Sequence, residues 1–352
     1  MEGDREVDCQ ASGRGDGVSL GTPPSVAEKI AAAGGDTDRF LWSDDRLTGR
    51  RARQTSRDTG LALSVRRLQW IGKAYERLSM PFAVFFAFSD RQFDPHYGMT
   101  WWKRTRLALR FYRNWRRIRT GVSYKVHLAL AAKILEIPRS VEGVVVECGC
   151  WLGGTTANLS IICDIVGRDL IVYDSFAGLP EPVEGDNMGP SARGAFRADL
   201  ESVRDNVRRH GIIDRCTFRK GWFEDSLKDH SERIVACFID VDLPSSIHTC
   251  LVHLWPHLTE RGYVFFDDYV RLNQCAVFFS EHFWRTYLDT DPPGLLGSGT
   301  GIGLGQYFFG PWPSHLATTP AQRPTSVAYT RKDFDGRWRY TPQESPTDEP
   351  RP

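Results

Sequence analysis

Two pairs of aspartates follow two apolar stretches in the second half of the chain. Asp240 and Asp242 follow the apolar run IVACFI, and Asp267 and Asp268 close the run YVFFDD. If both stretches are strands of an α/β sheet, all four carboxylates lie along the rim where such sheets bind ligands. Crowded carboxylates repel one another unless protons or a hard metal ion offset their charge, and oxygen-only ligands favour magnesium over zinc. The alternative is that each aspartate caps the helix that follows its strand.

A glycine-containing turn lies upstream of these aspartates. A run of valines predicts a buried parallel strand that ends at Glu147, and Gly149 and Gly153 follow before a helix that begins near Thr155. The next predicted strand, LIVYD, ends at Asp174, where a Rossmann-type unit holds a ribose hydroxyl. The turn lacks the GxGxxG fingerprint of dinucleotide sites. A nucleoside without a pyrophosphate, such as S-adenosylmethionine, therefore fits this turn better.

Six motifs occur in one order between about residues 141 and 269: ECGCWLGG, YDSFAGLPEP, GAFRADLESVRDNV, KGWFEDSL, DVDLPSS and GYVFFDDY. Together they resemble the macrocin O-methyltransferase (TylF) family, which are S-adenosylmethionine-dependent sugar O-methyltransferases of antibiotic pathways. The resemblance implies an α/β protein with the class I methyltransferase fold, a Rossmann-like, doubly wound and mostly parallel sheet with an N-terminal helical lid. It also implies S-adenosylmethionine and Mg²⁺ as cofactors and a small-molecule hydroxyl acceptor, a sugar or glycoside, as substrate.

The same resemblance assigns roles to the four aspartates. Asp240, Asp267 and Asp268 match the family's magnesium ligands, and Asp242 matches the residue proposed as general base. A sugar hydroxyl is a weak nucleophile, and coordination to a divalent ion lowers its pKa and orients it toward the methyl group. A neighbouring carboxylate can then take the proton, and a partly desolvated site would help it to do so.

The resemblance also implies a set of cofactor-binding residues. The methionine end of the cofactor is assigned to Glu147, Gly149, Gly153 and Thr155. Its ribose is assigned to Asp174 and Ser175, and its adenine to Trp222 and Asp225. An adenine needs an aromatic face for stacking and an acceptor for its exocyclic amine. The alternatives are core packing for Trp222 and helix capping for Asp225.

Two local features depart from the simple picture. Where the family usually reads DLYEST this chain reads DLPSSI, with Pro244 and Ser245 at positions that border the expected acceptor pocket, so the acceptor is in doubt more than the chemistry. Cys148 and Cys150 flank Gly149, and a CxC pair can bind a metal or act in redox chemistry. No second pair stands at zinc-like spacing, which favours cysteines that pack inside the fold.

Composition is that of an intracellular enzyme. The 352 residues are 41% hydrophobic and 12% aromatic, enough for one full α/β core with a helical appendage, and the net charge of +1 gives no support to nucleic-acid binding. Eight cysteines form no disulfide-like framework, no secretory signal opens the chain and no apolar run could cross a bilayer. We therefore expect a cytoplasmic protein.

Four regions are expected along the chain. Residues 1–60 are poor in large apolar side chains and are predicted to form a disordered lead, residues 61–137 a helical lid, 138–312 the methyltransferase domain and 313–352 a flexible tail. Within the domain, strands are expected near 143–148, 169–174, 234–240 and 262–268, and helices near 154–166, 198–210, 244–258 and 273–288. A final edge strand is expected at residues 307–309.

Residues 81–119 interleave aromatic and basic side chains, with no acidic residue from Trp101 to Thr120. This composition favours either contact with a membrane surface or a clamp for an anionic ligand. The alternative is a helical lid over the site, or a contact between subunits of a homo-oligomer, with the arginines in water.

Three functions remain open. The first is a magnesium-dependent O-methyltransferase that acts on a hydroxyl of a sugar or glycosylated natural product. The second changes the acceptor to a glycolipid or lipid-linked glycan at the membrane surface. The third is a catalytically inactive methyltransferase-fold binding module, against which the four retained aspartates argue.

Overall fold

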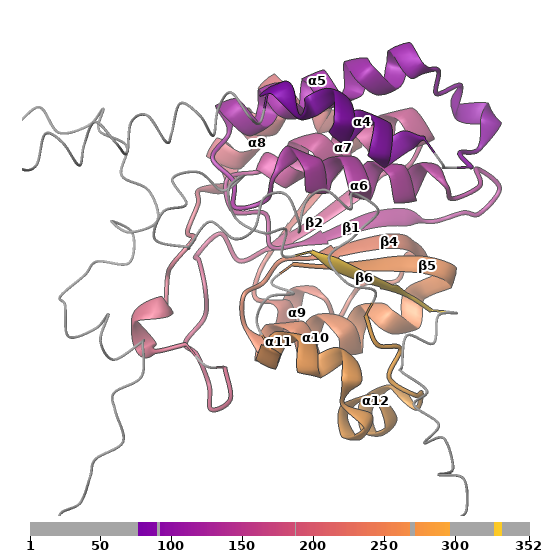
Figure 1. Cartoon of the computed structure of the whole chain (residues 1–352). Coiled ribbons are helices and arrows are strands. Elements are labelled where there is room, and N and C mark those ends of the chain that lie inside the picture. The colour runs from indigo at the N-terminus through magenta and orange to yellow at the C-terminus, as the bar shows by residue number, and fades with distance from the viewer. Residues whose placement is uncertain (1–76, 90–91, 187, 268–271, 296–326, 333–352) are drawn as a thin grey trace, which may run out of the picture. The chain divides into compact units, whose positions relative to one another are not determined.

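Six strands form one mixed sheet in the order β3-β2-β1-β4-β5-β6 (Figure 1). The computed structural model describes residues 77–89, 92–186, 188–267, 272–295 and 327–332. In chain order the strands are β1 Val144–Cys148, β2 Leu170–Asp174, β3 Cys216–Lys220, β4 Ile234–Ile239, β5 Leu258–Phe266 and β6 Ala328–Arg331. All neighbours are parallel except β5 and β6, which are antiparallel. This confirms the mostly parallel α/β sheet predicted from the sequence.

The central strands are buried on both faces, which explains their continuous apolar sequences. Side chains alternate across the sheet, so Val145 belongs to one hydrophobic cluster and Val146 to another. In β4 all six residues are buried, with Phe238 on one face and Ile239 on the other. A two-sided core of this kind requires helices on both faces.

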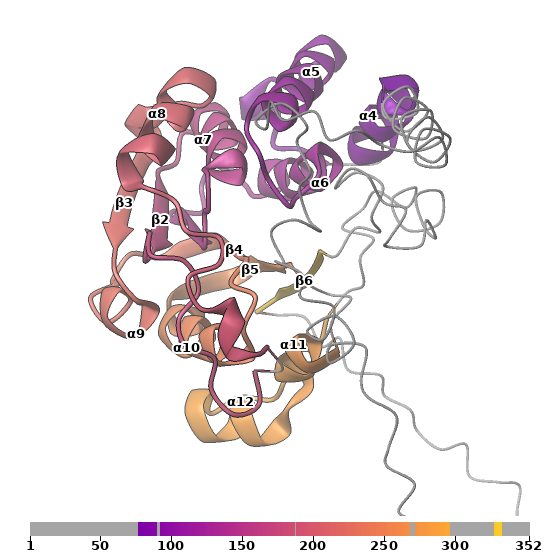
Figure 2. The same ribbon diagram turned by 90° about the vertical axis from the view of Figure 1, so that its left-hand side faces the viewer.

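Helices cover the two faces in chain order (Figures 1 and 2). One face carries α4 Met80–Phe88, α5 Trp101–Arg117, α6 Tyr124–Leu135, α7 Gly154–Val166 and α8 Leu200–His210. The other carries α9 Phe223–Ser226, α10 Pro244–Leu254, α11 Leu272–Ala276 and α12 Glu281–Leu288. Short 3₁₀ turns lie at Pro95–Tyr97, Pro190–Ala192, Ile213–Arg215, Trp255–His257 and Val277–Phe279.

Helix α6 is the centre of the helical side, and every one of its 12 residues is buried. Lys125, His127 and Lys133 are buried with it and each has a polar partner: Lys125 donates to the Ser79 hydroxyl at 3.3 Å, and Lys133 pairs with Glu136 at 3.1 Å. Residues expected to form a lid therefore contribute this helix to the core. The amphipathic α5 packs against α6 through Leu107 and Phe111, which is a clearer apolar face than the sequence suggested.

Strands β3 and β6 and the helices over 272–288 differ from the elements expected from the sequence. Strand β3 was not predicted, and β6 lies at Ala328–Arg331, inside the region expected to be a flexible tail. The expected strand at residues 307–309 lies outside the described residues. The helix expected over 273–288 is two helices, because α12 starts anew at Ser280, whose hydroxyl accepts from the Phe283 N–H at 3.2 Å.

No helix among the described residues has both the length and the apolar character needed to span a bilayer. The most apolar one, α4, contains nine residues.

Shortening an apolar side chain in α6 should destabilise the fold strongly. Leu130 is fully buried, so Leu130→Ala should lower the free energy of unfolding by about 2 to 5 kcal/mol, through lost burial and the cavity left behind. Leu109→Ala, on the exposed side of α5, is the matched control and should change it by about 0.5 kcal/mol or less. Urea denaturation measures both, and equal losses would show that α6 is not the core helix.

Candidate functional site

Three backbone hydrogen bonds extend the sheet by one residue beyond the carboxyl ends of its strands. Gly149 N–H donates to Tyr173 C=O at 2.9 Å, Asp240 N–H to Cys148 C=O at 2.9 Å, and Asp267 N–H to Ile239 C=O at 3.0 Å. Gly149, Asp240 and Asp267 therefore lie in neighbouring positions along one rim. The sequence prediction that the aspartates following β4 and β5 share this rim is confirmed for Asp240 and Asp267, whereas Asp268 lies outside the described residues.

Glycine at position 149 is a steric requirement of this rim. Its φ is +83°, and a Cβ there would lie 2.0 Å from the carbonyl oxygen of Asp240. Gly153, with φ +78°, precedes α7, and a Cβ there would meet the side chain of Val203 at 3.0 Å. The two glycines thus let the turn pack tightly against the end of β4 and against α8.

Asp174 holds the turn in place from the end of β2. Its Oδ2 accepts the N–H of Cys150 at 2.7 Å and of Trp151 at 3.3 Å, and its Oδ1 accepts the N–H of Phe176 at 2.7 Å. A carboxylate offers about four acceptor positions, so this one retains capacity for a ligand hydroxyl. The adjacent Ser175 hydroxyl donates to Gly178 C=O at 3.0 Å, within its own loop.

Glu147 is the most unusual group of the site. It is fully buried at the end of β1, and neither carboxylate oxygen has a hydrogen-bond partner among the described residues. Burial raises its pKa from an ordinary value of 4.5 to about 8, although the nearby hydroxyl of Thr156 acts to lower it. A buried, unsatisfied carboxyl is costly to the fold, and a cationic ligand donor beside it would relieve that cost.

A buried chain of polar side chains leads from α5 to the turn. Asn114 Nδ2 donates to Asn158 Oδ1 at 2.9 Å, Asn158 Nδ2 meets His127 Nδ1 at 2.8 Å, and His127 Nε2 meets Thr155 Oγ1 at 3.1 Å. Burial lowers the pKa of His127 to about 3, so its ring is neutral.

The direction of this chain follows from the donors. Because Nδ1 of His127 accepts from Asn158, Nε2 carries the ring proton and donates to Thr155, which leaves the threonine's own hydroxyl hydrogen to donate to a ligand. Sequence reasoning found Thr155 but not His127 or Asn158. The His lies 28 residues from its partner, and no local signal marked it.

The two residues expected near an adenine lie around α9. Trp222 precedes this helix and is 40% exposed, so it is not packed in the core. Asp225 lies inside α9, not at its cap, and forms an exposed pair with Lys228 at 3.0 Å. Both expected alternatives, core packing and helix capping, are therefore wrong, and the adenine role stays a prediction.

Asp242 has a strained backbone. Its φ is +61°, and Leu243 N–H donates to Val241 C=O at 2.7 Å, which makes Asp242 the centre of a three-residue turn of a rare, strained type. The side-chain amide of the buried Gln274 donates to the Asp242 carbonyl and supports this turn from α11. Strain of this kind is common at functional sites, which suits the position assigned to a general base.

The loop after β2 is tied to α10 by a buried carboxylate that the sequence did not reveal. Asp186 is 3% exposed and accepts both the backbone N–H and the hydroxyl of Ser245 at 2.9 Å. It also accepts the N–H of Val183 at 2.8 Å. Since the residue before α10 gives no side-chain cap, Asp186 caps this helix from a distant loop. The unusual Ser245 of DLPSSI thus has a structural partner.

Neither the predicted magnesium site nor the CxC pair forms a complete metal-binding cluster among the described residues. Among the described residues, no three His, Cys, Asp or Glu side chains converge to hold an ion. The oxygen donors Asp240 and Asp267 lie on neighbouring strands and suit a hard cation such as Mg²⁺. Cys148 and Cys150 are free and buried, and burial raises the pKa of both thiols well above the ordinary value, which suits packing and not redox chemistry.

Adding a methyl group at Gly149 should disrupt the rim. Gly149→Ala combines an unfavourable φ with a clash against the Asp240 backbone, so it should lower the free energy of unfolding by about 2 kcal/mol or more. Gly167→Ala is the matched control, because φ there is +69° but nothing lies within 4 Å, and it should cost only about 1 kcal/mol. Urea unfolding would compare the two, and equal costs would refute the close approach.

Residues 127–291 match the family model of macrocin-O-methyltransferase (TylF). The chain is 34% identical over 140 residues to the 8-demethyl-8-(2,3-dimethoxy-alpha-L-rhamnosyl)-tetracenomycin-C 4'-O-methyltransferase of Streptomyces olivaceus, covering 37% of this chain and 54% of the relative. It is 31% identical over 150 residues to the demethyldecarbamoylnovobiocin O-methyltransferase of Streptomyces niveus, covering 40% and 57%. The matches thus span just over half the length of these relatives.

A solved structure, that of the O-methyltransferase NovP, is similar with a TM-score of 0.43 and 22% identity, over 58% of this chain and 79% of that one. The family match covers the strands β1 to β5 and the rim on which the candidate site lies. Residues 127–291 of this chain are therefore similar to the macrocin O-methyltransferase (TylF) family.

Proposed function

We propose that this protein transfers a methyl group from S-adenosylmethionine to a hydroxyl of a sugar or glycosylated natural product, with the help of Mg²⁺. The observation that carries the proposal is the buried, unpartnered carboxyl of Glu147 beside a glycine turn and two rim aspartates. The names of the two relatives specify a rhamnosyl-tetracenomycin and a demethyldecarbamoylnovobiocin as acceptors, which supports the acceptor class.

The residues around the turn suit the methionine end of the cofactor. The Glu147 carboxylate would accept hydrogen bonds from the α-ammonium group, and the ion pair would offset the cost of burying both charges. The hydroxyl of Thr155, which His127 orients, would donate to the α-carboxylate. Glycine at positions 149 and 153 lets the turn pack against the Asp240 backbone and the Val203 side chain, which would hold the turn in place beside the ligand.

Other residues would position the nucleoside. Asp174 would accept from a ribose hydroxyl while it continues to hold the turn, and Ser175 lies beside it. The exposed face of Trp222 would stack on the adenine, and Asp225 would accept from its amine in place of its pair with Lys228. Water would be excluded from the stacked ring but not from Asp225, whose side chain is exposed.

The rim aspartates would act on the acceptor. Asp240, Asp267 and Asp268 would hold Mg²⁺, which when bound supplies a Lewis acid that lowers the pKa of a coordinated hydroxyl. Asp242 would take the proton of that hydroxyl as the oxygen attacks the methyl carbon, the carbon–sulfur bond breaks and S-adenosylhomocysteine leaves. Its strained turn, held by Gln274, would fix the position of this carboxylate relative to the metal ligands.

The state of Glu147 gives a direct test of cofactor binding. With a pKa of about 8 its carboxyl is largely protonated at pH 7, whereas a bound α-ammonium group would lower that pKa and expel the proton. Titration calorimetry with S-adenosylmethionine at pH 7, in buffers of different ionisation enthalpy, should therefore show release of close to one proton per site. Glu147→Gln should abolish the release and weaken binding by about tenfold or more.

The pH dependence of the free energy of unfolding, measured for wild type and Glu147→Gln, provides a control without ligand. Because the folded pKa of Glu147 is raised, wild-type stability should fall as pH rises from about 4.5 to about 8, where only the unfolded state loses the proton. Glu147→Gln should flatten this slope. No binding of cofactor, or binding without proton release, would contradict the assignment of Glu147.

Substitution at the rim should weaken Mg²⁺ binding and leave S-adenosylmethionine binding unchanged. Asp267→Asn should raise the Mg²⁺ concentration needed for half-maximal methyl transfer by about tenfold or more, because it removes a charged oxygen ligand. Affinity for S-adenosylmethionine should be unchanged in calorimetry. Glu260→Gln, an exposed change earlier in β5, is the control and should match wild type in both assays. An Mg²⁺ requirement identical in all three proteins would remove Asp267 from the metal site.

A further inference from the structure

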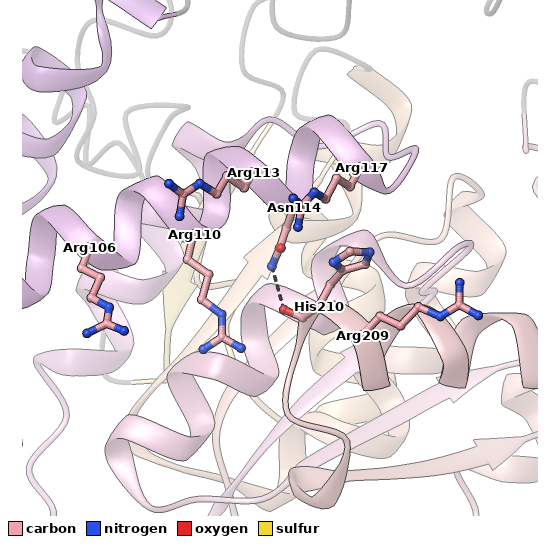
Figure 3. Close-up of a pocket in the computed structure, with 7 residues that line it drawn as sticks. All are labelled: Arg106, Arg110, Arg113, Asn114, Arg117, Arg209 and His210. Atoms are coloured by element: carbon pink, nitrogen blue, oxygen red, sulfur yellow. Dashed lines mark hydrogen bonds between the residues drawn. The ribbon is translucent and has the colours of Figure 1, made fainter.

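A cavity of about 330 Å³ lies between α5 and the end of α8, and its lining is almost entirely cationic (Figure 3). The lining residues are Arg106, Arg110, Arg113, Asn114, Arg117, Arg209 and His210. None of them is acidic. The cavity contains none of the residues assigned to the methyl-transfer site.

The four arginines of α5 form a continuous stripe because of their spacing. Arg106, Arg110, Arg113 and Arg117 follow one another at intervals of four, three and four residues, which places them on one face of a helix. The opposite face of α5 is buried, and Thr100 caps the first turn by accepting from Lys103 N–H. Packing of the apolar face therefore fixes the direction in which the arginines project.

Most of these charges are unpaired within the described part of the chain. Arg106, Arg113 and Arg117 form no ion pair with a described carboxylate, and Arg209 approaches Asp205 only at 4.0 Å. Elsewhere on α8 an arginine has a close acidic neighbour, as Arg204 has in Glu201 at 2.7 Å. The stripe is thus a local excess of positive charge on a protein whose net charge is only +1.

The remaining lining residues show that the cations act on one another. Burial, followed by the charges of Arg117 and Arg209, lowers the pKa of His210. Burial is also the main cause of a lowered pKa at Arg110; the charge of Asp164 opposes this lowering, and that of Arg106 adds to it. An anion in the cavity would relieve this repulsion.

The floor of the cavity is built from fixed groups. Asn114 is 4% exposed and donates from Nδ2 both to the carbonyl of His210 at 3.0 Å and to Asn158 at 2.9 Å. Arg110 donates to the carbonyl of Gly211 at 3.3 Å. These bonds tie α5 to the end of α8, so the two walls of the cavity are held together without a ligand.

We propose that this cavity binds a phosphate-bearing anion. Guanidinium groups match phosphate oxygens with paired hydrogen bonds, and five of them offer more charge than a single carboxylate could offset. The phosphate could belong to a free diphosphate or to the headgroup of an anionic lipid. An exposed tryptophan supports the lipid headgroup as the source, because tryptophan side chains favour the membrane interface. Trp102 lies one helical turn before Arg106 and is 74% exposed.

Titration calorimetry of the full chain with sodium pyrophosphate tests whether the cavity binds a free diphosphate. The variant combines Arg113→Gln and Arg117→Gln, two exposed positions without ion pairs to described residues, so the fold should be retained. We expect wild-type binding that weakens as salt increases, and at least about tenfold weaker binding by the variant. Arg208→Gln is the matched control, because Arg208 lies on α8 but pairs with Asp205 outside the cavity.

Vesicle sedimentation tests the lipid source. Vesicles of phosphatidylglycerol, compared with phosphatidylcholine, should retain wild type and Arg208→Gln but not the double variant if the headgroup is the ligand. Trp102→Ala should reduce retention on vesicles and leave pyrophosphate binding unchanged. The proposal is overturned if wild type binds neither probe, or if the double variant binds as wild type does.

These outcomes are separable from those of the methyl-transfer proposal. Calorimetry with S-adenosylmethionine should give the same affinity for wild type and the double variant, because no lining arginine belongs to the glycine turn. Loss of cofactor binding in the double variant would show that the cavity is part of the first site, and would overturn its assignment as a separate one.

Discussion

The site depends on the register between β1, β4 and β5 where these strands end. Backbone hydrogen bonds from Asp240 and Asp267 continue the sheet by one residue, and they bring these two residues to adjacent positions of the rim. The register is possible because position 149 has no Cβ, which would otherwise lie against the Asp240 carbonyl. One glycine therefore governs both the turn expected to hold the cofactor and the spacing of the residues expected to hold the metal. The buried Glu147, two residues earlier, is fixed by the same strand.

The fold could be predicted where burial is two-sided. β1, β2, β4 and β5 have nearly continuous apolar sequences, which is the pattern of parallel strands covered on both faces. β3 was missed because its sequence CTFRK is polar and its residues are only partly buried at the edge of the sheet. β6 was missed because its composition resembles that of the surrounding tail, and only pairing with β5 makes it a strand. Local sequence holds little information about such edge strands, since tertiary contacts decide them.

The candidate site shows the same division. Residues at the ends of strands could be found from motif and spacing, and the structure brings Glu147, Gly149, Asp174, Asp240 and Asp267 to one rim. Supporting residues could not be found in this way. His127 reaches Thr155 from another helix, and Asp186 reaches Ser245 across 59 residues, so neither contact leaves a periodic or local signal. Such partners become visible only when the helices and loops are placed in three dimensions.

The bond between Asp186 and Ser245 has a consequence for the exchange of parts between relatives. The loop after β2 and the first turn of α10 are joined by a carboxylate that satisfies the helix N-terminus, a backbone amide of its own loop and a hydroxyl at once. A chimera that imports either segment alone would leave a buried acid without two of its three donors, or a helix end without its cap. These two segments therefore form a single module, and recombination that respects the fold should transfer them as a pair.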